Sequence, residues 1–248
     1  MFEDSVANRG AGTFVVNLAP GRDLWLESPH ADSDQGTLAQ GAHQLLGLGA
    51  RAYLITGSHR CASAAETPCS GKSNMCGGKL RRADAAHYDL TFFHSAHRAL
   101  RYAFPSAVAV NVHGMDVDGV EAAVISNGTK APQPGSLSVR FRDALNTRLP
   151  ENLRAFSCND PNDEGQHRPL CGTTNVQGRA DNGSSDACRA ASTTGGDRFL
   201  HLEQAASLRS APPGDPLSDA VIAALADVVP CTLGGAGLGC SEAAVACR

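Results

Sequence analysis

Four short polar clusters in this 248-residue chain each follow an apolar run that is typical of a β-strand. They are Glu27 and His30 with Asp34, His59 with Arg60, His113, and His201 with Glu203. In an open α/β sheet the carboxyl ends of the strands converge on one crevice, so residues far apart in sequence can form one site. Imidazole and carboxylate groups suit metal-dependent hydrolysis, which is the chemistry that these clusters indicate.

His30, Asp34 and His113 are the candidate ligands of one zinc ion. His30 ends a strand-like run at a proline-stiffened turn, and Asp34 leads into a helical pattern, so both can face the same space. His113 follows the apolar run 107–112. A catalytic zinc ion needs three protein ligands and one position open for water, and Glu27 is an alternative carboxylate ligand.

Structural roles for the same residues stay open at this point. Asp34 or Thr37 could cap the following helix, with His30 as a turn residue. His113 could be a structural histidine bonded to a carbonyl group.

Glu203 is the candidate catalytic residue, at the end of the late strand-like run 198–203. A glutamate beside a zinc site can act as general base and then give its proton to the leaving amine. A surface carboxylate on an edge strand would give the same pattern. His201 alternates with Glu203 on one strand face and is a candidate for orienting the site.

Basic residues are candidates for holding a substrate carboxylate, because an arginine fork binds a carboxylate through two hydrogen bonds. They are His59 with Arg60, and Arg179. Asp84 and His87 lie at a predicted helix start and are candidates for orienting a metal ligand; a capping Asp and a helix-surface His are the ordinary alternative.

Strand-like and helix-like segments alternate along the chain. Residues 13–18, 23–27, 52–56, 107–112, 120–125 and 198–203 read as strands, and residues 37–48, 85–102 and 216–229 read as helices. This order predicts an α/β fold with a mainly parallel sheet that is covered on both faces. His94 and His97, beside two phenylalanines on the second helix, are expected to be packing or surface residues.

The order of these residues resembles the zinc carboxypeptidase and N-acetylmuramoyl-alanine amidase superfamily. His30 with the run Asp34-Gln-Gly-Thr37 also resembles the first metal motif of poly-gamma-glutamate hydrolases. The resemblance implies a three-layer α/β sandwich, a single zinc ion and a catalytic glutamate at position 203. The chain departs from the His-x-x-Glu pair of carboxypeptidases, since it has Glu27-x-x-His30 in the reverse order and an Asp at position 34.

The nine cysteines fall in three local groups among Gly-, Ser-, Asn- and Asp-rich stretches. Such stretches need covalent staples, and no CxxC pair supports a zinc cluster, so we expect disulfides and an exported protein, secreted, periplasmic or at the cell surface. Their connectivity stays open, and the odd number leaves at least one cysteine free or paired outside the chain. The sequence starts without a signal segment, so export is expected to use a leader that is not included here.

The composition of the chain makes some classes of partner improbable. A hydrophobic content of 42% is ample for a core, and a net charge of −4 offers no basic field for nucleic acid. No run approaches the roughly 20 apolar residues of a membrane span. We expect one domain over residues 1–248, with a Cys-, Gly- and Asn-rich insertion at about 158–197 that is pinned by disulfides.

These observations predict an exported zinc hydrolase that cleaves an amide or peptide bond. A carboxylate-bearing, peptide-like substrate, such as an acidic peptide, a peptidoglycan stem or poly-gamma-glutamate, would suit the arginines. A metal-dependent esterase or phosphoesterase with the same ligands is one alternative. The other is a secreted binding protein in which the histidines serve structure.

Overall fold

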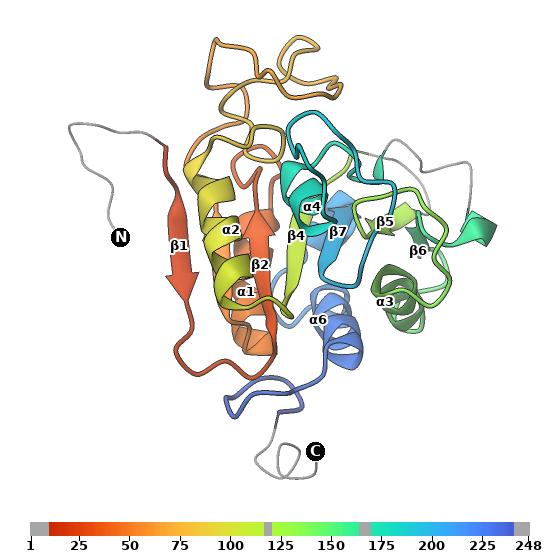
Figure 1. The fold of residues 1–248 in the computed structure, drawn as a ribbon. Helices are drawn as coiled ribbons and strands as arrows, with labels where there is room; N and C mark the ends of the chain where they lie inside the picture. The colour runs from red at the N-terminus through yellow and green to blue at the C-terminus, as the bar shows by residue number, and fades with distance from the viewer. Residues whose placement is uncertain (1–9, 117–120, 164–169, 241–248) are drawn as a thin grey trace.

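A seven-stranded mixed sheet forms the centre of the protein (Figure 1). The structure is a computed structural model, and it describes residues 10–116, 121–163 and 170–240. The strand order is β1-β3-β2-β4-β7-β5-β6. The strands are β1 (Thr13–Val16), β2 (Leu24–Ser28), β3 (Ala52–Ile55), β4 (Val108–Gly114), β5 (Glu121–Ser126), β6 (Arg154–Ser157) and β7 (Phe199–Gln204).

Most strand pairings are parallel, as the alternating pattern predicted. β2 pairs in parallel with both β3 and β4, β4 with β7, and β5 with β6. Only β1 on β3 and β5 on β7 are antiparallel among the described strands. The α/β class is therefore confirmed, and four consecutive strands, β3, β2, β4 and β7, end at the same edge of the sheet.

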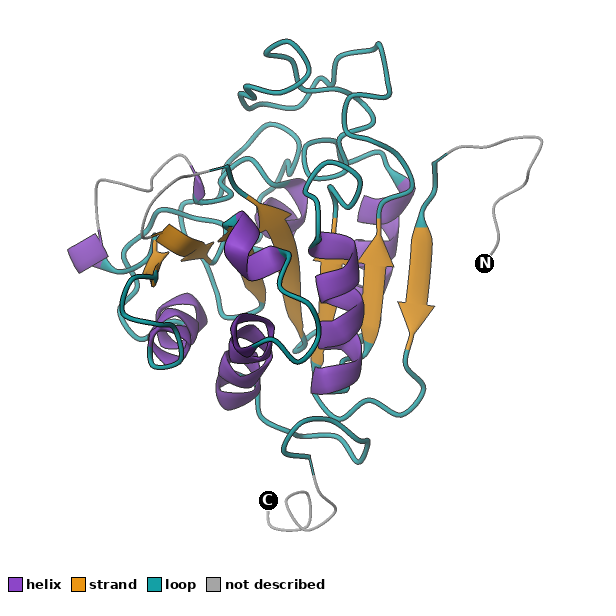
Figure 2. Ribbon diagram, turned by 180° about the vertical axis from the view of Figure 1, so that it is seen from behind, coloured by secondary structure: helices purple, strands orange, loops and turns teal. Residues whose placement is uncertain are grey.

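Six α-helices and one short 3-10 helix connect the strands within the described residues. They are α1 (Thr37–Leu48), α2 (Phe92–Ala103), α3 (Leu137–Asn146), η1 (Pro161–Asp163), α4 (Val176–Asp181), α5 (Ala206–Arg209) and α6 (Pro216–Val228). Helices α2 and α4 lie in front of the sheet in Figure 1, whereas Figure 2, seen from behind, brings α1 and α6 to the front.

Strand alternation divides the core between the two faces of the sheet. Leu24 and Leu26 of β2 join the larger cluster, which also holds Val221 and Leu225 of α6. Trp25, between them, joins a second cluster with Phe199, against which Leu100 of α2 packs. Side chains alternate along a strand. A polar residue of β2 on the same side of the strand as Trp25 therefore points toward α2 and α4.

The predicted helix over 85–102 is wrong at its start, because α2 begins at Phe92. The Thr91 side chain caps this helix by accepting a hydrogen bond from the His94 N–H at 3.0 Å. Residues before Thr91 form turns and bends instead. Asp84 and His87 therefore sit in a loop, where their side chains bond to distant segments rather than to a helix.

Five other elements have no counterpart in the predicted pattern: α3, β6, η1, α4 and α5. Helix α3 buries Leu137, Phe141 and Leu145 at a spacing of four residues, which is a helical signal. Helix α4 has only six residues, too few for periodicity to show. The predicted strand 120–125 is found as β5 from Glu121, and Val120 lies outside the described residues.

Four disulfides are present, as the sequence predicted. They join Cys61 to Cys76, Cys69 to Cys188, Cys158 to Cys171, and Cys231 to Cys240. Cys247 lies outside the described residues. In the described ranges, no helix has the length and apolar character needed to cross a membrane.

Candidate metal centre and active site

The carboxyl ends of β2, β4 and β7 bring three of the predicted clusters together. In the parallel ladder of β4 and β7, Asn111 pairs with His201, and His113 pairs with Glu203. His30 follows β2 by two residues, and the backbone N–H of Asp34 donates to the His30 carbonyl at 2.8 Å. This turn places both side chains over the same edge of the sheet.

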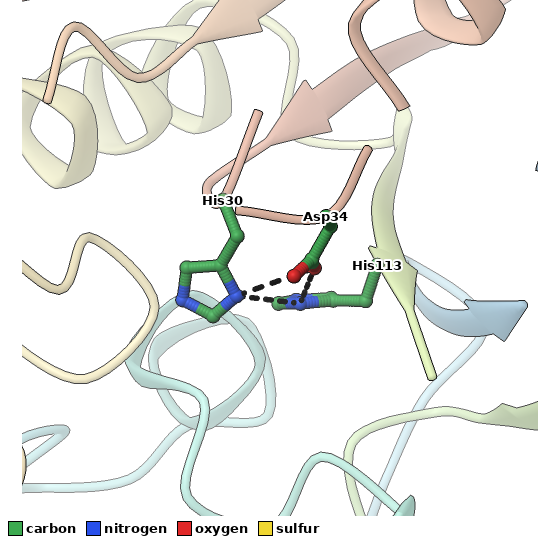
Figure 3. A group of neighbouring side chains, drawn as sticks. All are labelled: His30, Asp34 and His113. Carbon is green, nitrogen blue, oxygen red and sulfur yellow. Dashed lines mark hydrogen bonds and ion pairs between the residues drawn. The ribbon is translucent and has the colours of Figure 1, made fainter. Parts of the chain in front are cut away.

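His30, Asp34 and His113 point toward one another (Figure 3). Their facing atoms are His30 Nδ1, His113 Nδ1 and Asp34 Oδ2. The two nitrogens are 3.1 Å apart, and Asp34 Oδ2 lies 3.5 Å from each of them. All three residues are buried. The structure therefore brings together the three candidate ligands that the sequence predicted.

The capping alternatives do not describe these residues. Gly36 occupies the N-cap position of α1, and no side chain caps that helix. The Asp34 carboxylate instead accepts the backbone N–H of Gly114 at 3.0 Å, besides facing the two histidines.

The buried Asp84 carboxylate orients His30. Its Oδ1 accepts hydrogen bonds from His30 Nε2 at 2.8 Å and from His87 Nδ1 at 2.9 Å. Its Oδ2 accepts from Arg60 Nε at 3.1 Å and Nη2 at 2.8 Å. In the neutral ring, which a metal ligand must be, a proton on His30 Nε2 leaves the lone pair of Nδ1 directed at Asp34 and His113. Asp84, His87 and Arg60 thus act as one support for His30.

His201 and Glu203 lie beside His113 on the same face of the sheet. The His113 and His201 rings have their centroids 4.6 Å apart, and His201 Nε2 lies 3.7 Å from Glu203 Oε1. His113 Nε2 and His201 Nδ1 are buried and have no hydrogen-bond partner among the described residues. Gly172 leaves room for the His201 ring, because a Cβ there would come within 2.6 Å of it.

Burial and neighbouring charges raise the pKa of some of these groups and lower the pKa of others. Burial alone lowers the pKa of His30, but the carboxylates of Asp84 and Asp34 outweigh it and raise the pKa to about 9. Burial lowers the pKa of His113 to about 4. Burial and the nearby Asp34 raise the pKa of Glu203 to about 8. Burial also opposes ionisation of Asp34, yet the two imidazoles keep its pKa well below the usual range.

A cavity of about 610 Å³ opens onto this group. Its lining includes the three candidate ligands, Glu203 and His201, and also the basic residues Arg60, Lys72 and Arg209. Its size lies within the range of small-molecule and peptide sites. The arrangement can therefore hold a substrate next to two imidazoles and two carboxylates.

Three other predicted residues are not brought to this cavity. Glu27 points toward α2, where its oxygens accept from Trp25 Nε1, His97 Nδ1 and Asn111 Nδ2 at 2.7 to 2.8 Å. The Arg179 guanidinium donates to the carbonyls of Thr173, Ala187 and Cys188. His59 lines a different cavity, and its Nδ1 accepts the backbone N–H of Cys61.

Several cavity residues were not identified from the sequence. Lys72 and Asn74 come from the segment 61–76, Asn175 precedes α4, and Arg209 ends α5. Lys72 and Asn74 lie in a stretch without periodicity, so their position depends on disulfides that the sequence leaves unassigned. The only sequence signal for Arg209 is that it is a basic residue soon after the predicted strand 198–203.

The fold is similar to several solved hydrolase structures, all at low identity. A bacteriophage poly-gamma-glutamate hydrolase is 15% identical with a TM-score of 0.46, covering 89% of this chain and 91% of that one. N-formylglutamate amidohydrolase from Ralstonia eutropha JMP134 is 16% identical with a TM-score of 0.45, covering 88% and 97%. A metallo-carboxypeptidase from Burkholderia cenocepacia is 13% identical with a TM-score of 0.42, covering 89% and 65%.

No protein-family model matches the sequence, and no curated protein matches it. The similar structures include a poly-gamma-glutamate hydrolase and a metallo-carboxypeptidase, the kinds of protein that the motif order resembles. At these TM-scores the likeness decides nothing about the chemistry, which has to be inferred from the side chains of this chain.

Proposed function

We propose that this protein is an exported zinc-dependent hydrolase that cleaves an amide or peptide bond. The observation that supports it best is the convergence of His30 Nδ1, His113 Nδ1 and Asp34 Oδ2 to within 3.5 Å of one another at the edge of a cavity that Glu203 also lines.

The three donor atoms fit a zinc ion in number, type and spacing. Ligand atoms on a tetrahedral zinc with bonds of roughly 2.0–2.2 Å lie about 3.4 Å apart. The observed separations of 3.1 to 3.5 Å agree with this value. The hydrogen bond from His30 Nε2 to Asp84 keeps Nδ1 available as a ligand atom. Three protein ligands leave a fourth position open, as catalytic zinc sites require.

Held by His30, Asp34 and His113, a zinc ion would lower the pKa of water to about 7 and would polarise the scissile carbonyl group. Glu203 accepts a proton from the attacking water and then delivers it to the leaving nitrogen. Asp84 holds the His30 ring, and Arg60 holds Asp84 in turn, so the site is organised before the substrate arrives.

Domain structure and export belong to the same proposal. We take residues 1–248 as one hydrolytic domain, with the segment 158–197 as its insertion. A sheet between two helical layers is supported by the contacts of α1 and α3 with α6, and of α2 with α4. Four disulfides support an oxidising, extracytoplasmic location.

Metal analysis with substitutions tests the proposal. Protein purified without added metal should carry about one equivalent of zinc by plasma mass spectrometry, and His30→Ala and His113→Ala should each lose it. His43→Ala is the matched control, because His43 bonds Ser218 away from the site. Glu203→Gln should keep zinc and lose amide hydrolysis.

The possible outcomes separate the alternatives. Protein that takes up no metal, even when zinc is offered, would refute the hydrolase mechanism and favour a binding protein. A zinc-loaded protein that cleaves esters or phosphoesters but no amide would identify the esterase alternative.

A further inference from the structure

Cationic side chains at the cavity are the groups that would select a substrate by charge. Apart from the candidate ligand His30, those that line it in the described part of the chain are Arg60, Lys72 and Arg209. The lining carboxylates Asp34 and Asp116 would repel an acidic substrate. A substrate with a carboxylate therefore needs a cation whose charge is not already used within the protein.

Arg60 and Arg209 are committed to holding the protein together. Arg60 makes two hydrogen bonds to the buried Asp84 carboxylate. Arg209 donates through Nε to the Gln35 carbonyl at 2.9 Å, and through Nη1 to the carbonyls of Met115 and Gln204 at 3.0 and 2.8 Å. Moving a guanidinium toward a substrate would break two hydrogen bonds of Arg60 or three of Arg209, which costs free energy.

Lys72 differs from both arginines. It is exposed, and it makes no hydrogen bond or ion pair with any other residue that the structure describes. The segment that carries it, which rises above the sheet in Figure 1, is held by the Cys61–Cys76 disulfide and, three residues before Lys72, by the Cys69–Cys188 disulfide. Two covalent anchors thus position an unpaired ammonium group at the cavity.

We propose that Lys72 binds a carboxylate of the substrate that lies away from the scissile bond, so that this site prefers acidic peptides to neutral ones of the same shape. The inference rests on the proposed hydrolase function, whose scissile bond would lie at His30, Asp34 and His113. Asn74 and Met75 from the same segment also line the cavity and would contact the intervening part of the peptide.

Binding measurements on a protein that does not turn over separate recognition from catalysis. The probes are an N-acetylated, C-amidated triglutamate and its triglutamine counterpart, which have the same shape and differ in charge. They are titrated against zinc-loaded Glu203→Gln protein by calorimetry at low and high salt. The variants compared in this background are Lys72→Ala, Lys72→Arg and Lys79→Ala. Lys79 is the matched control, since it pairs with Glu66 and does not line the cavity.

Lys72→Ala should weaken triglutamate binding about fivefold, as expected for one partly exposed ion pair, and leave triglutamine unchanged. Lys72→Arg should retain the preference, Lys79→Ala should match the parent protein, and high salt should reduce the preference. An unchanged ratio of the two affinities in Lys72→Ala, or an equal loss in Lys79→Ala, would overturn the inference.

Turnover by the protein with Glu203 intact is then measured separately. If neither peptide nor any other amide is cleaved while Lys72 still discriminates in binding, the proposed hydrolase function fails and the carboxylate site stands. If amides are cleaved without discrimination at Lys72, the hydrolase stands and the carboxylate site fails.

Discussion

Asp84 connects the candidate metal ligand His30 to the rest of the protein. A single buried carboxylate accepts four hydrogen bonds from three side chains, His30, His87 and Arg60. His87 extends the support further, because its Nε2 lies 3.1 Å from Thr174 Oγ1. Burial disfavours the charge of Asp84, but the imidazoles of His30 and His87 keep its pKa well below the usual range. Asp84 therefore stays ionised and can fix the His30 ring.

Replacing Asp84 by Asn should weaken zinc binding by about 10- to 100-fold, because the carboxylate both orients His30 and increases the basicity of its ring. The affinity is measured by competition with a chromophoric chelator. Asp32→Asn is the control, since Asp32 is exposed on the turn between His30 and Asp34. Equal zinc affinities in the two variants would show that Asp84 does not support the ligand.

Prediction from sequence succeeded where a residue's position follows from a strand end. His30, His113 and Glu203 each follow or end an apolar run, and parallel pairing brings such ends together. Glu27 and Arg179 could not be placed in this way, because their positions depend on hydrogen-bond partners far along the chain. Glu27 bonds His97, 70 residues later, on a face of the sheet that only the strand register decides.

A polar network beneath α2 ties four elements together. His97 of α2 lies between two carboxylates, with Nδ1 2.7 Å from Glu27 Oε1 of β2 and Nε2 3.2 Å from Asp181 Oδ1 of α4. Arg101 adds two hydrogen bonds to Asp181, and Asn111 of β4 donates to Glu27. The expectation of a packing or surface role for His97 omitted this network, which forms only when the sheet and both helices are assembled.

The protonation of His97 should make stability depend on pH. Burial lowers the pKa of His97, but Glu27 and Asp181 outweigh it and raise the pKa to about 10. The unfolded value is about 6.5, so between these values the folded state holds a proton that the unfolded state lacks. This contribution to stability is fully present below pH 6.5 and is lost as the pH rises toward 10.

Urea unfolding at pH 6.5 and pH 9 tests this expectation. The free energy of unfolding should fall as the pH rises, and its slope should be smaller in His97→Gln by up to roughly 1 kcal/mol per pH unit. His30 and Glu203, whose pKa values are also raised, contribute the slope that remains in this variant. The pKa of the neighbouring His94 is lowered to about 4 by burial and by His97. His94 is therefore neutral in the folded protein between pH 6.5 and pH 9. His43→Gln serves as control, and a slope equal to that of the native protein in His97→Gln would contradict the assignment.

Elements were predictable in proportion to their length and regularity. The strands with continuous apolar runs and the helix Thr37–Leu48 lie where their periodicity placed them. The start of α2 could not be predicted, because the helical pattern continues through Ala85 and Ala86, whose side chains are buried in a loop. Tertiary contacts of Asp84 and His87 decide the conformation of that loop, and these are not visible in local sequence.

The molecule as a whole divides into a sheet that carries the candidate ligands and loops that complete the cavity. The candidate ligands belong to β4 and to the turn after β2, which are held by hydrogen bonds and core packing. The loops that supply Lys72, Asn74 and Gly172 instead depend on disulfides. Cys69–Cys188 spans 119 residues and joins the segment before α2 to the segment after α4.

Removing the Cys69–Cys188 link should therefore cost stability without emptying the metal site. Closure of a loop of this length restricts the unfolded chain by roughly 5 kcal/mol, against about 2.5 kcal/mol for the nine-residue separation of Cys231 and Cys240. The double variants Cys69→Ser/Cys188→Ser and Cys231→Ser/Cys240→Ser are compared by urea unfolding and by zinc content. The first should be the less stable of the two, and both should retain about one zinc ion. Loss of zinc from the first variant would mean that the loops, rather than the sheet, position the ligands.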